Sequence, residues 1–256
     1  MQYPWTSALV TGASSGIGEA IARQLATAGV DVTVVARRTD RLEEIATDHP
    51  GVVVVAADLT ESTDVSRVAE LLNDPAHPIE LLVNCAGVGA SGPFVDGSID
   101  IYHQLIDLNV SALVTLTHAA IGPMGRAGRG WIINISSLGG HTPGPSFAVY
   151  SATKAFVTSF SESLFEESRK AGVVVTAVCP GATRTEFGET AGAVGDDLPA
   201  MLWQTADEVA TESLEAAARG RAVRVTGTIN RITGALTTVM PRAVNRRLSG
   251  LVTSKL

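Results

Sequence analysis

Short apolar runs, separated by segments with helical patterns, constrain the fold of this chain more than any other feature. The runs are rich in Val, Ile and Leu, and several are apolar at consecutive rather than alternate positions. Consecutive apolar residues are typical of parallel strands that helices cover on both faces. The predicted strands are residues 7–10, 32–36, 52–56, 81–84, 131–135 and 173–178, with a short last strand near 222–225.

Helical patterns fill the intervals between these runs. They cover residues 17–28, 40–48, 64–72, 102–120, 150–170 and 207–218. Because the chain contains no internal repeat or interdomain linker, residues 1–256 are predicted to form a single α/β domain. The expected architecture is a doubly wound parallel sheet of about seven strands, with helices on both faces. Residues 188–199, rich in Gly, Ala and Asp, indicate a mobile substrate loop within 186–206.

Charge is distributed unevenly along the chain. The net charge is −7, yet from Arg219 onward there are eight basic residues and no acidic one. The preceding part therefore carries −15, which argues against duplex nucleic acid as a partner. No apolar run approaches the roughly 20 residues that span a bilayer. With no signal-peptide pattern and only Cys85 and Cys179, both expected to be buried thiols, a cytoplasmic location is expected.

A glycine-rich loop follows the first predicted strand. Residues 11–18 read Thr-Gly-Ala-Ser-Ser-Gly-Ile-Gly, and a predicted helix begins at the end of this loop. Glycines permit a tight turn and a close approach of the backbone, while amides at the helix N-terminus can receive a pyrophosphate. The alternative is a plain strand–helix turn. The position of the loop, on the first strand of an alternating β/α pattern, favours a dinucleotide site.

The second predicted strand ends in Arg37 and Arg38. An acidic residue about 20 positions beyond such a loop would bind the ribose hydroxyls of NAD(H). This chain has two guanidinium groups there instead, and their planar geometry suits a 2′-phosphate. The residues therefore favour NADP(H) over NAD(H), although a solvated pair of arginines at a helix start is the alternative.

Tyr150 and Lys154 lie four residues apart on a predicted helix and so share one face. A free phenol has a pKa of roughly 10, and a neighbouring ammonium group favours the phenolate. Lys154 is therefore expected to lower the pKa of Tyr150, which could then exchange a proton with a substrate oxygen near neutral pH. Chance also places Tyr and Lys at this spacing on ordinary helices, so the pair needs support from other motifs.

In the order of its motifs, the chain resembles the short-chain dehydrogenase/reductase family over nearly its whole length. Thr11–Gly18 resembles the glycine motif of that family, and Cys85 stands where its Asn-Asn-Ala-Gly motif has a second Asn. The remaining motif residues follow in the family order: Asp58, Leu59, Asn84, Ala86, Gly87, Asn109, Ser137, Tyr150, Lys154, Pro180, Gly181 and Thr185. The five histidines show no metal-ligand spacing, so no metal site is expected.

The resemblance implies a catalytic role for four residues. Tyr150 would be the proton donor or acceptor, and the Ser137 hydroxyl would bind the substrate oxygen. Lys154 would hold the nicotinamide ribose, and Asn109 would link Lys154 to water. Ser136 is the neighbouring alternative to Ser137, but its side chain is expected to point into the sheet.

The resemblance also implies a set of NADP(H) contacts. Asp58 would meet the adenine, Asn84, Ala86 and Gly87 would line the adenosine side, and Gly181 and Thr185 would touch the nicotinamide end. The whole implied set is Gly12, Ser14, Ser15, Gly16, Ile17, Gly18, Arg37, Arg38, Asp58, Leu59, Asn84, Ala86, Gly87, Tyr150, Lys154, Pro180, Gly181, Thr183 and Thr185.

The expected function is an NADP(H)-dependent oxidoreductase that interconverts a carbonyl and a secondary alcohol. Expected pocket walls at residues 138–145, which include His141, and 188–201 carry few charges, so a mainly apolar substrate is predicted. A nucleotide-sensing or scaffold protein with the same fold is the alternative. The apolar stripe of Phe156, Phe160 and Leu164 is interpreted first as a packing face of the domain. The family resemblance implies a second interpretation, in which this stripe forms the contact of a homodimer or homotetramer.

The basic tail, residues 227–256, has a helical pattern of its own. Apolar residues recur on one helical stripe, and the arginines fall largely off it. Packing of this stripe on the domain or on another subunit is favoured, since the acidic body is a nearby partner. Contact with an anionic membrane surface is the alternative. The stripe consists of Met240, Val244, Leu248, Leu251 and Val252.

Overall fold

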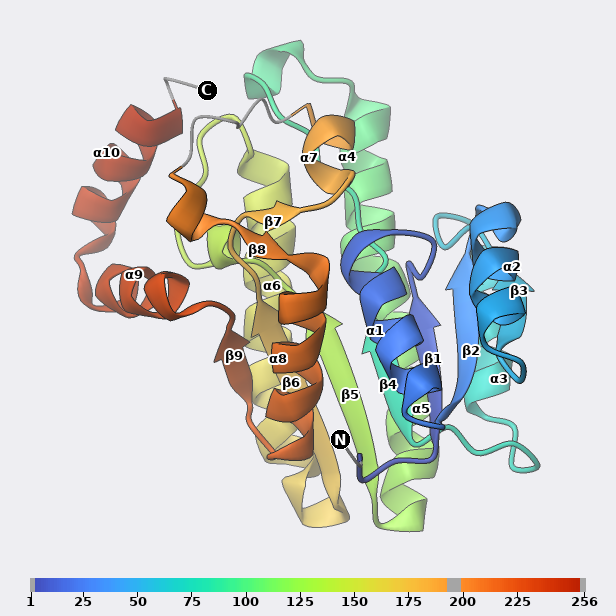
Figure 1. Ribbon diagram of the computed structural model, residues 1–256. Coiled ribbons are helices and arrows are strands. Elements are labelled where there is room, and N and C mark those ends of the chain that lie inside the picture. The colour runs from blue at the N-terminus through green and yellow to red at the C-terminus, as the bar shows by residue number, and fades with distance from the viewer. Residues whose placement is uncertain (1–2, 193–198, 254–256) are drawn as a thin grey trace.

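A central sheet of seven parallel strands organises the molecule (Figure 1). The computed structural model describes residues 3–192 and 199–253. The strand order is β3-β2-β1-β4-β5-β6-β9, so the doubly wound α/β fold is confirmed. Every predicted strand is present, with ends that differ by at most a few residues. The strands are β1 (Ser7–Thr11), β2 (Asp31–Ala36), β3 (Val53–Ala56), β4 (Leu81–Asn84), β5 (Gly130–Ile135), β6 (Val173–Cys179) and β9 (Val223–Val225).

Helices cover both faces of this sheet because alternate residues of each buried strand point to opposite sides. Val10 and Val34 pack in one buried cluster, which also holds residues of α1 (Gly16–Thr27), α2 (Thr39–Asp48) and α8 (Ala206–Ala218). Leu9 and Val35 pack in the other, with residues of α3 (Ser62–Leu72), α5 (Leu113–Ala127) and α6 (Ala148–Ser168). The consecutive apolar residues of the strands thus form two cores.

One helical stretch differs from the regular helix predicted for residues 102–120. It begins with α4 (Ile99–Ile106), widens into a π-helical turn over Asp107–Ala112, and continues as α5. By length and composition, Ile99–Ala127 is apolar enough to cross a membrane. Half of its apolar 18-residue window is buried within the fold, however, and Leu116, Ala120 and Met124 pack in the core against the sheet. This stretch is a core element of the domain.

The segment after β6 contains short elements that the sequence patterns did not indicate. β7 (Thr183–Arg184) and β8 (Gln204–Thr205) form a small parallel sheet, and α7 (Phe187–Thr190) lies between them. Residues 193–198 of the predicted mobile loop lie outside the described residues. The mobility of the segment therefore stays a prediction.

The described part of the basic tail is helical and extends from the end of β9, at the edge of the sheet away from β3 (Figure 1). It forms α9 (Thr228–Val239) and α10 (Arg242–Thr253). The side chain of Asn245 is buried and donates a hydrogen bond to the Thr237 carbonyl at 2.6 Å. This bond ties α10 back to α9. Of the predicted apolar stripe, Leu248, Leu251 and Val252 have side chains outside the described residues, while Val244 is exposed.

Candidate active site

The glycine loop lies where β1 and β4 are neighbours at the centre of the sheet, the point at which the strand order reverses. Gly12 has a φ of +67°, and a Cβ atom there would stand 2.7 Å from the Ala86 amide nitrogen. A Cβ atom on Gly18 would stand 2.3 Å from the Gly12 carbonyl oxygen. The Thr11 hydroxyl accepts hydrogen bonds from the Cys85 and Ala86 amides at 3.0 and 3.1 Å. The loop therefore has no room for side chains at these two glycines.

Helix α1 begins at Gly16 with an N-terminus that its own capping residue leaves open. Ser15 occupies the N-cap position in extended conformation, and its side chain makes no capping hydrogen bond. The first-turn amides, which include those of Ile17 and Gly18, carry the positive end of the helix dipole. Glycines that bring the backbone close and an uncapped helix start fit the pyrophosphate of a dinucleotide.

Both arginines after β2 have carboxylate partners. Arg37 Nη1 lies 3.6 Å from Asp58 Oδ2, and Arg38 Nη1 lies 2.9 Å from Glu186 Oε2. The Arg38 Nε also donates to the Ser14 hydroxyl at 3.3 Å. Burial raises the pKa of Asp58, but hydrogen bonds from Thr60 and the charge of Arg37 outweigh it and leave that pKa lowered. Ionised groups thus surround the outer end of the glycine loop.

Two of the predicted cofactor residues direct their side chains into the core. Leu59 is buried in the cluster that contains α3 and α5. Asn84 is buried as well, and its Nδ2 donates to Thr117 Oγ1 at 3.0 Å and to Asn134 Oδ1 at 2.9 Å. These side chains stabilise the sheet, so only the main chain of Leu59 and Asn84 remains to meet a nucleotide.

Ser137 and Tyr150 come together at the carboxyl end of β5. The Ser137 hydroxyl accepts a hydrogen bond from the Gly139 amide at 3.0 Å and also hydrogen-bonds the phenol of Tyr150. Ser136 faces the other way, as strand alternation predicts. It is buried, and its hydroxyl donates to the Lys154 carbonyl at 2.7 Å.

Lys154 is buried on the same face of α6 as Tyr150. Its Nζ donates to the Ile135 carbonyl at 2.9 Å and lies 5.8 Å from the centre of the Tyr150 ring. Burial lowers the pKa of Lys154 to about 8, an effect that the Cys85 and Cys179 thiols oppose. Both thiols are free.

The expected effect of Lys154 on Tyr150 differs from the observed one. Burial raises the pKa of Tyr150, and the hydrogen bond from Ser137 opposes this rise. The desolvation of the phenolate outweighs that hydrogen bond, so the pKa of Tyr150 is raised rather than lowered. Phe187 from α7 contributes to this crowding, because its ring centre lies 5.4 Å from that of Tyr150.

Asn109 lies in the π-helical turn and is almost fully buried. Its amide group donates to the Val88 carbonyl at 2.9 Å and to Thr153 Oγ1 at 3.1 Å, and its Oδ1 accepts from the Val88 amide at 3.0 Å. Asn109 therefore joins the loop after β4 to α6 beside Lys154. Both amide hydrogens of Asn109 are donated, so a link from its side chain to water would use the second acceptor site of Oδ1. π-Helical turns are frequent at functional sites.

The last predicted cofactor residues follow β6. The Pro180 carbonyl accepts a hydrogen bond from the Leu138 amide at 2.8 Å, and Thr183 Oγ1 donates to the Gly181 carbonyl at 3.1 Å. A Cβ atom on Gly181 would stand 2.3 Å from Nδ2 of Asn230, a buried residue of α9. A Cβ atom on Gly16 would stand 2.9 Å from the Thr185 methyl group. Helix α9 therefore packs directly behind this part of the site.

Three residues next to the predicted site escaped the sequence patterns: Glu186, Phe187 and Asn230. The folded chain brings Glu186 to Arg38 beside the glycine loop, Phe187 to Tyr150 on α6, and Asn230 to Gly181 after β6. Their one sequence signal is position, since Glu186 and Phe187 directly follow Thr185. His141, which the sequence placed in an expected pocket wall, follows Gly140, and burial lowers its pKa.

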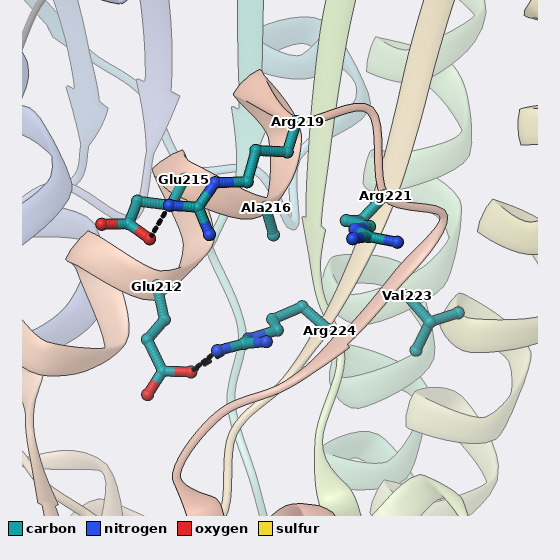
Figure 2. A pocket seen from close by; sticks show the side chains of 7 residues that line it. All are labelled: Glu212, Glu215, Ala216, Arg219, Arg221, Val223 and Arg224. Atoms are coloured by element: carbon teal, nitrogen blue, oxygen red, sulfur yellow. Dashed lines mark hydrogen bonds and ion pairs between the residues drawn. The ribbon is translucent and has the colours of Figure 1, made fainter.

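A cavity of about 260 Å³ lies elsewhere, between α8 and β9 (Figure 2). Glu212 pairs with Arg224 at 2.7 Å, and Glu215 pairs with Arg219 at 2.9 Å, so most of its charges are compensated. None of the predicted site residues lines it. Within the described residues, no group of three or more His, Cys, Asp or Glu side chains is arranged to hold a metal ion.

The family described as short chain dehydrogenase matches residues 6–193. The chain belongs to this family. A solved short-chain dehydrogenase from Sphingobium yanoikuyae, in complex with NADPH, is 35% identical, with a TM-score of 0.80 over 93% of this chain and 97% of that one. The bulky-bulky ketone specific alcohol dehydrogenase from Comamonas testosteroni is 31% identical, with a TM-score of 0.78 over 93% and 96%.

A curated relative, sulfoacetaldehyde reductase 2 of Chromohalobacter salexigens, is 37% identical over 70% of this chain and 73% of the relative. The family assignment and these neighbours identify the protein as an oxidoreductase of the short-chain dehydrogenase family that acts on CH–OH groups. A small-molecule substrate and a nucleotide cofactor follow from that membership.

Proposed function

We propose that this protein is an NADP(H)-dependent oxidoreductase that interconverts a carbonyl and a secondary alcohol. One observation carries the proposal: the Ser137 hydroxyl meets the Tyr150 phenol beside the buried Lys154, at the sheet edge that also holds the glycine loop. A proton carrier, a donor for the substrate oxygen and a cation therefore converge next to a dinucleotide cradle.

The cofactor would be held along the carboxyl edge of the sheet. The first-turn amides of α1 fit the pyrophosphate, and Arg38, beside Ser14, fits a 2′-phosphate. Lys154 and Thr185 stand at the expected nicotinamide end. The nicotinamide of a bound cofactor would supply or accept the hydride.

In the reducing direction, Tyr150 donates its phenolic proton to the carbonyl oxygen while hydride reaches the carbonyl carbon. Ser137 donates a hydrogen bond to the same oxygen and so stabilises the negative charge that develops there. Lys154 stabilises the phenolate that remains, which is costly because burial raises the pKa of Tyr150. In the oxidising direction, Tyr150 takes the proton back.

Transfer of label separates this proposal from a nucleotide-sensing protein. NADPH deuterated at nicotinamide C4 is mixed with a panel of ketones and aldehydes, its absorbance is followed, and the alcohols are analysed by mass spectrometry. We expect at least one alcohol to carry deuterium on its carbinol carbon. Binding of NADPH without turnover on any panel member would favour the sensor instead.

We expect the best substrates in that panel to be mainly apolar. Phe147 stands near Tyr150, with ring centres 6.4 Å apart. Apolar aromatic surface next to the proton carrier favours ketones with hydrocarbon substituents, because burial of such groups is favourable. Charged carbonyl compounds in the same panel are the control, and a preference for them would contradict this substrate class.

A homodimer is proposed from an apolar groove of about 440 Å³ between α6 and the α4/π-helical segment. Ile106, Val110 and Phe156 line it, and Phe156 is 40% exposed and stacks on Phe160 at 5.5 Å. Exposed apolar surface of this kind commonly marks an interface. Phe156→Glu should yield monomers in analytical ultracentrifugation, while Ser66→Glu, at an exposed position of α3 that does not line the groove, should not. An unchanged mass for Phe156→Glu would place the contact elsewhere.

We place the enzyme in the cytoplasm, which the free thiols of Cys85 and Cys179 support. We place its tail against its own fold or a neighbouring subunit, which the packing of Asn230 against Gly181 supports. Co-sedimentation with anionic vesicles at about 0.1 M salt, where the Debye length is about 10 Å, tests the tail. If the protein pellets with the vesicles, and a variant truncated at Pro241 does not, the tail contacts membranes. Recovery of the protein in the membrane fraction of cells would overturn the cytoplasmic location.

A further inference from the structure

The two arginines at the end of β2 differ in the origin of their partners. Asp58, the partner of Arg37, lies close behind β3, the neighbouring strand. Glu186, the partner of Arg38, comes from 148 residues further along the chain, at the start of α7. Arg38 also donates to the hydroxyl and the carbonyl of Ser14, at 3.3 and 3.4 Å. Arg38 therefore connects the glycine loop to the segment that leads into α7.

Three consecutive residues of that segment reach three parts of the site. Thr185 packs over Gly16, Glu186 pairs with Arg38, and Phe187 packs on Tyr150. The Thr185 hydroxyl also accepts a hydrogen bond from the Phe187 amide at 3.3 Å, which fixes these residues relative to one another. A change at Glu186 is thus transmitted to the aromatic ring that stands on the proton carrier.

The Arg38–Glu186 pair is of a kind that a phosphate group can displace. The side chains of Arg38 and Glu186 are 44% and 47% exposed, and exposed ion pairs contribute little to stability. A phosphate carries more negative charge and more acceptor oxygens than a carboxylate, so it is the stronger partner for a guanidinium group. Glu186 is ionised at neutral pH, because the hydrogen bond and charge of Arg38 lower its pKa.

We propose that Glu186 is a specificity-determining residue: its carboxylate competes with the 2′-phosphate of NADP(H) for Arg38, and NADP(H) binding thereby releases the segment that carries Phe187. NAD(H), which lacks this phosphate, leaves the pair intact. Glu186 therefore reduces the preference for NADP(H) and couples the adenosine end of the site to the catalytic end. This inference rests on the proposed use of NADP(H).

Nucleotide titrations of the full-length protein test the competition. Glu186→Gln is compared with wild type and with Glu189→Gln, a matched change on the same short helix. The probes are NADPH and NADH by fluorescence, and adenosine 2′,5′-bisphosphate and AMP by calorimetry. We expect Glu186→Gln to tighten binding of the two 2′-phosphorylated probes about two- to fivefold, as for exposed ion pairs, and to leave NADH and AMP unchanged. Glu189→Gln should change none of them by as much.

Each failure has its own signature. Equal affinity of the wild type for NADPH and NADH would overturn the proposed cofactor, and this inference with it. A wild type that prefers NADPH, together with a Glu186→Gln variant in which NADPH binding is unchanged or NADH binding tightens equally, would overturn the role of Glu186 alone.

Hydrogen–deuterium exchange tests the release of the segment without any turnover. Peptides over residues 183–192 are followed with no nucleotide, with AMP and with adenosine 2′,5′-bisphosphate. Uptake in these peptides should rise in Glu186→Gln without nucleotide, and in the wild type with the bisphosphate but not with AMP. Uptake that is the same in all these samples would show that the pair does not hold α7.

Discussion

The two ends of the cofactor-binding region hold their charges in different ways. At the catalytic end, Lys154 is 6% exposed, and burial shifts its pKa to about 8. At the adenosine end, the side chains of Arg37 and Arg38 are 64% and 44% exposed and pair with carboxylates at the surface. Charges interact strongly where water is excluded and weakly where it is not. If the proposed function holds, the chemistry is expected at the buried end and the choice between NADPH and NADH at the exposed end.

Loss of the proton carrier is the largest effect that this comparison predicts. Tyr150→Phe should reduce turnover by about 10²–10⁴-fold, the usual contribution of general acid–base catalysis, and leave NADPH affinity nearly unchanged. Steady-state kinetics on a verified substrate and a fluorescence titration measure the two quantities. Tyr102→Phe, which alters an exposed phenol that donates to the Phe94 carbonyl, is the control. Retention of more than about a tenth of wild-type turnover by Tyr150→Phe would exclude the assigned role.

Loss of the phosphate-binding cation should have a smaller and more selective effect. Arg38→Ala should weaken NADPH binding roughly tenfold, the low end for a charge-assisted hydrogen bond, and leave NADH binding nearly unchanged. Arg37→Ala should act in the same direction, since Arg37 stands beside it. Arg169→Ala removes an exposed arginine of another region and serves as the control. Equal losses for both cofactors would mean that the arginines do not read the phosphate.

The buried cation should make stability depend on pH. The pKa of Lys154 falls from 10.5 to about 8 on folding, so its contribution is lost as the pH falls through about 8. Between about pH 7 and 9 the wild type should therefore gain about 1 kcal/mol of unfolding free energy relative to Lys154→Met. Urea unfolding of both proteins at each pH measures the difference. A difference that is constant across this range would show that Lys154 keeps its ordinary pKa.

The smallest predicted effect is that of salt, which should weaken the preference for NADPH but not the turnover. Raising the salt from about 0.05 to 0.5 M shortens the Debye length several-fold and screens exposed charges more than buried ones. The preference for NADPH over NADH should fall a few-fold, while turnover at saturating cofactor stays nearly constant. Titrations and kinetics at the same salt concentrations provide both values. A fall in turnover as large as the fall in preference would contradict the comparison.

The sequence was sufficient for the sheet and for the grouping of Ser137, Tyr150 and Lys154. Consecutive apolar residues predicted β1 and β2 correctly because buried strands must be apolar on both faces. Strand alternation also separated Ser136, which is buried, from Ser137, which reaches Tyr150. These inferences depend only on local periodicity and on the order of motifs.

Other features depend on tertiary contacts that periodicity cannot indicate. The π-helical turn around Asn109 lies within a stretch whose apolar pattern predicted a regular helix. The direction of the Tyr150 pKa shift depends on desolvation, which the spacing of Tyr150 and Lys154 does not report. The Arg38–Glu186 pair joins residues 148 positions apart. Each of these is decided by what the folded chain places nearby.

The strand order has a consequence for how the protein acquires its nucleotide site during folding. β1 pairs with β2, about 24 residues later, but also with β4, more than 70 residues later. Contacts between distant residues form slowly, because long loops must close first. Thr185 and Lys154 come from the second half of the chain, so the site is completed only after most of the chain has folded. We expect NADPH to bind late in refolding, so it should not stabilise a chain in which the site is still incomplete.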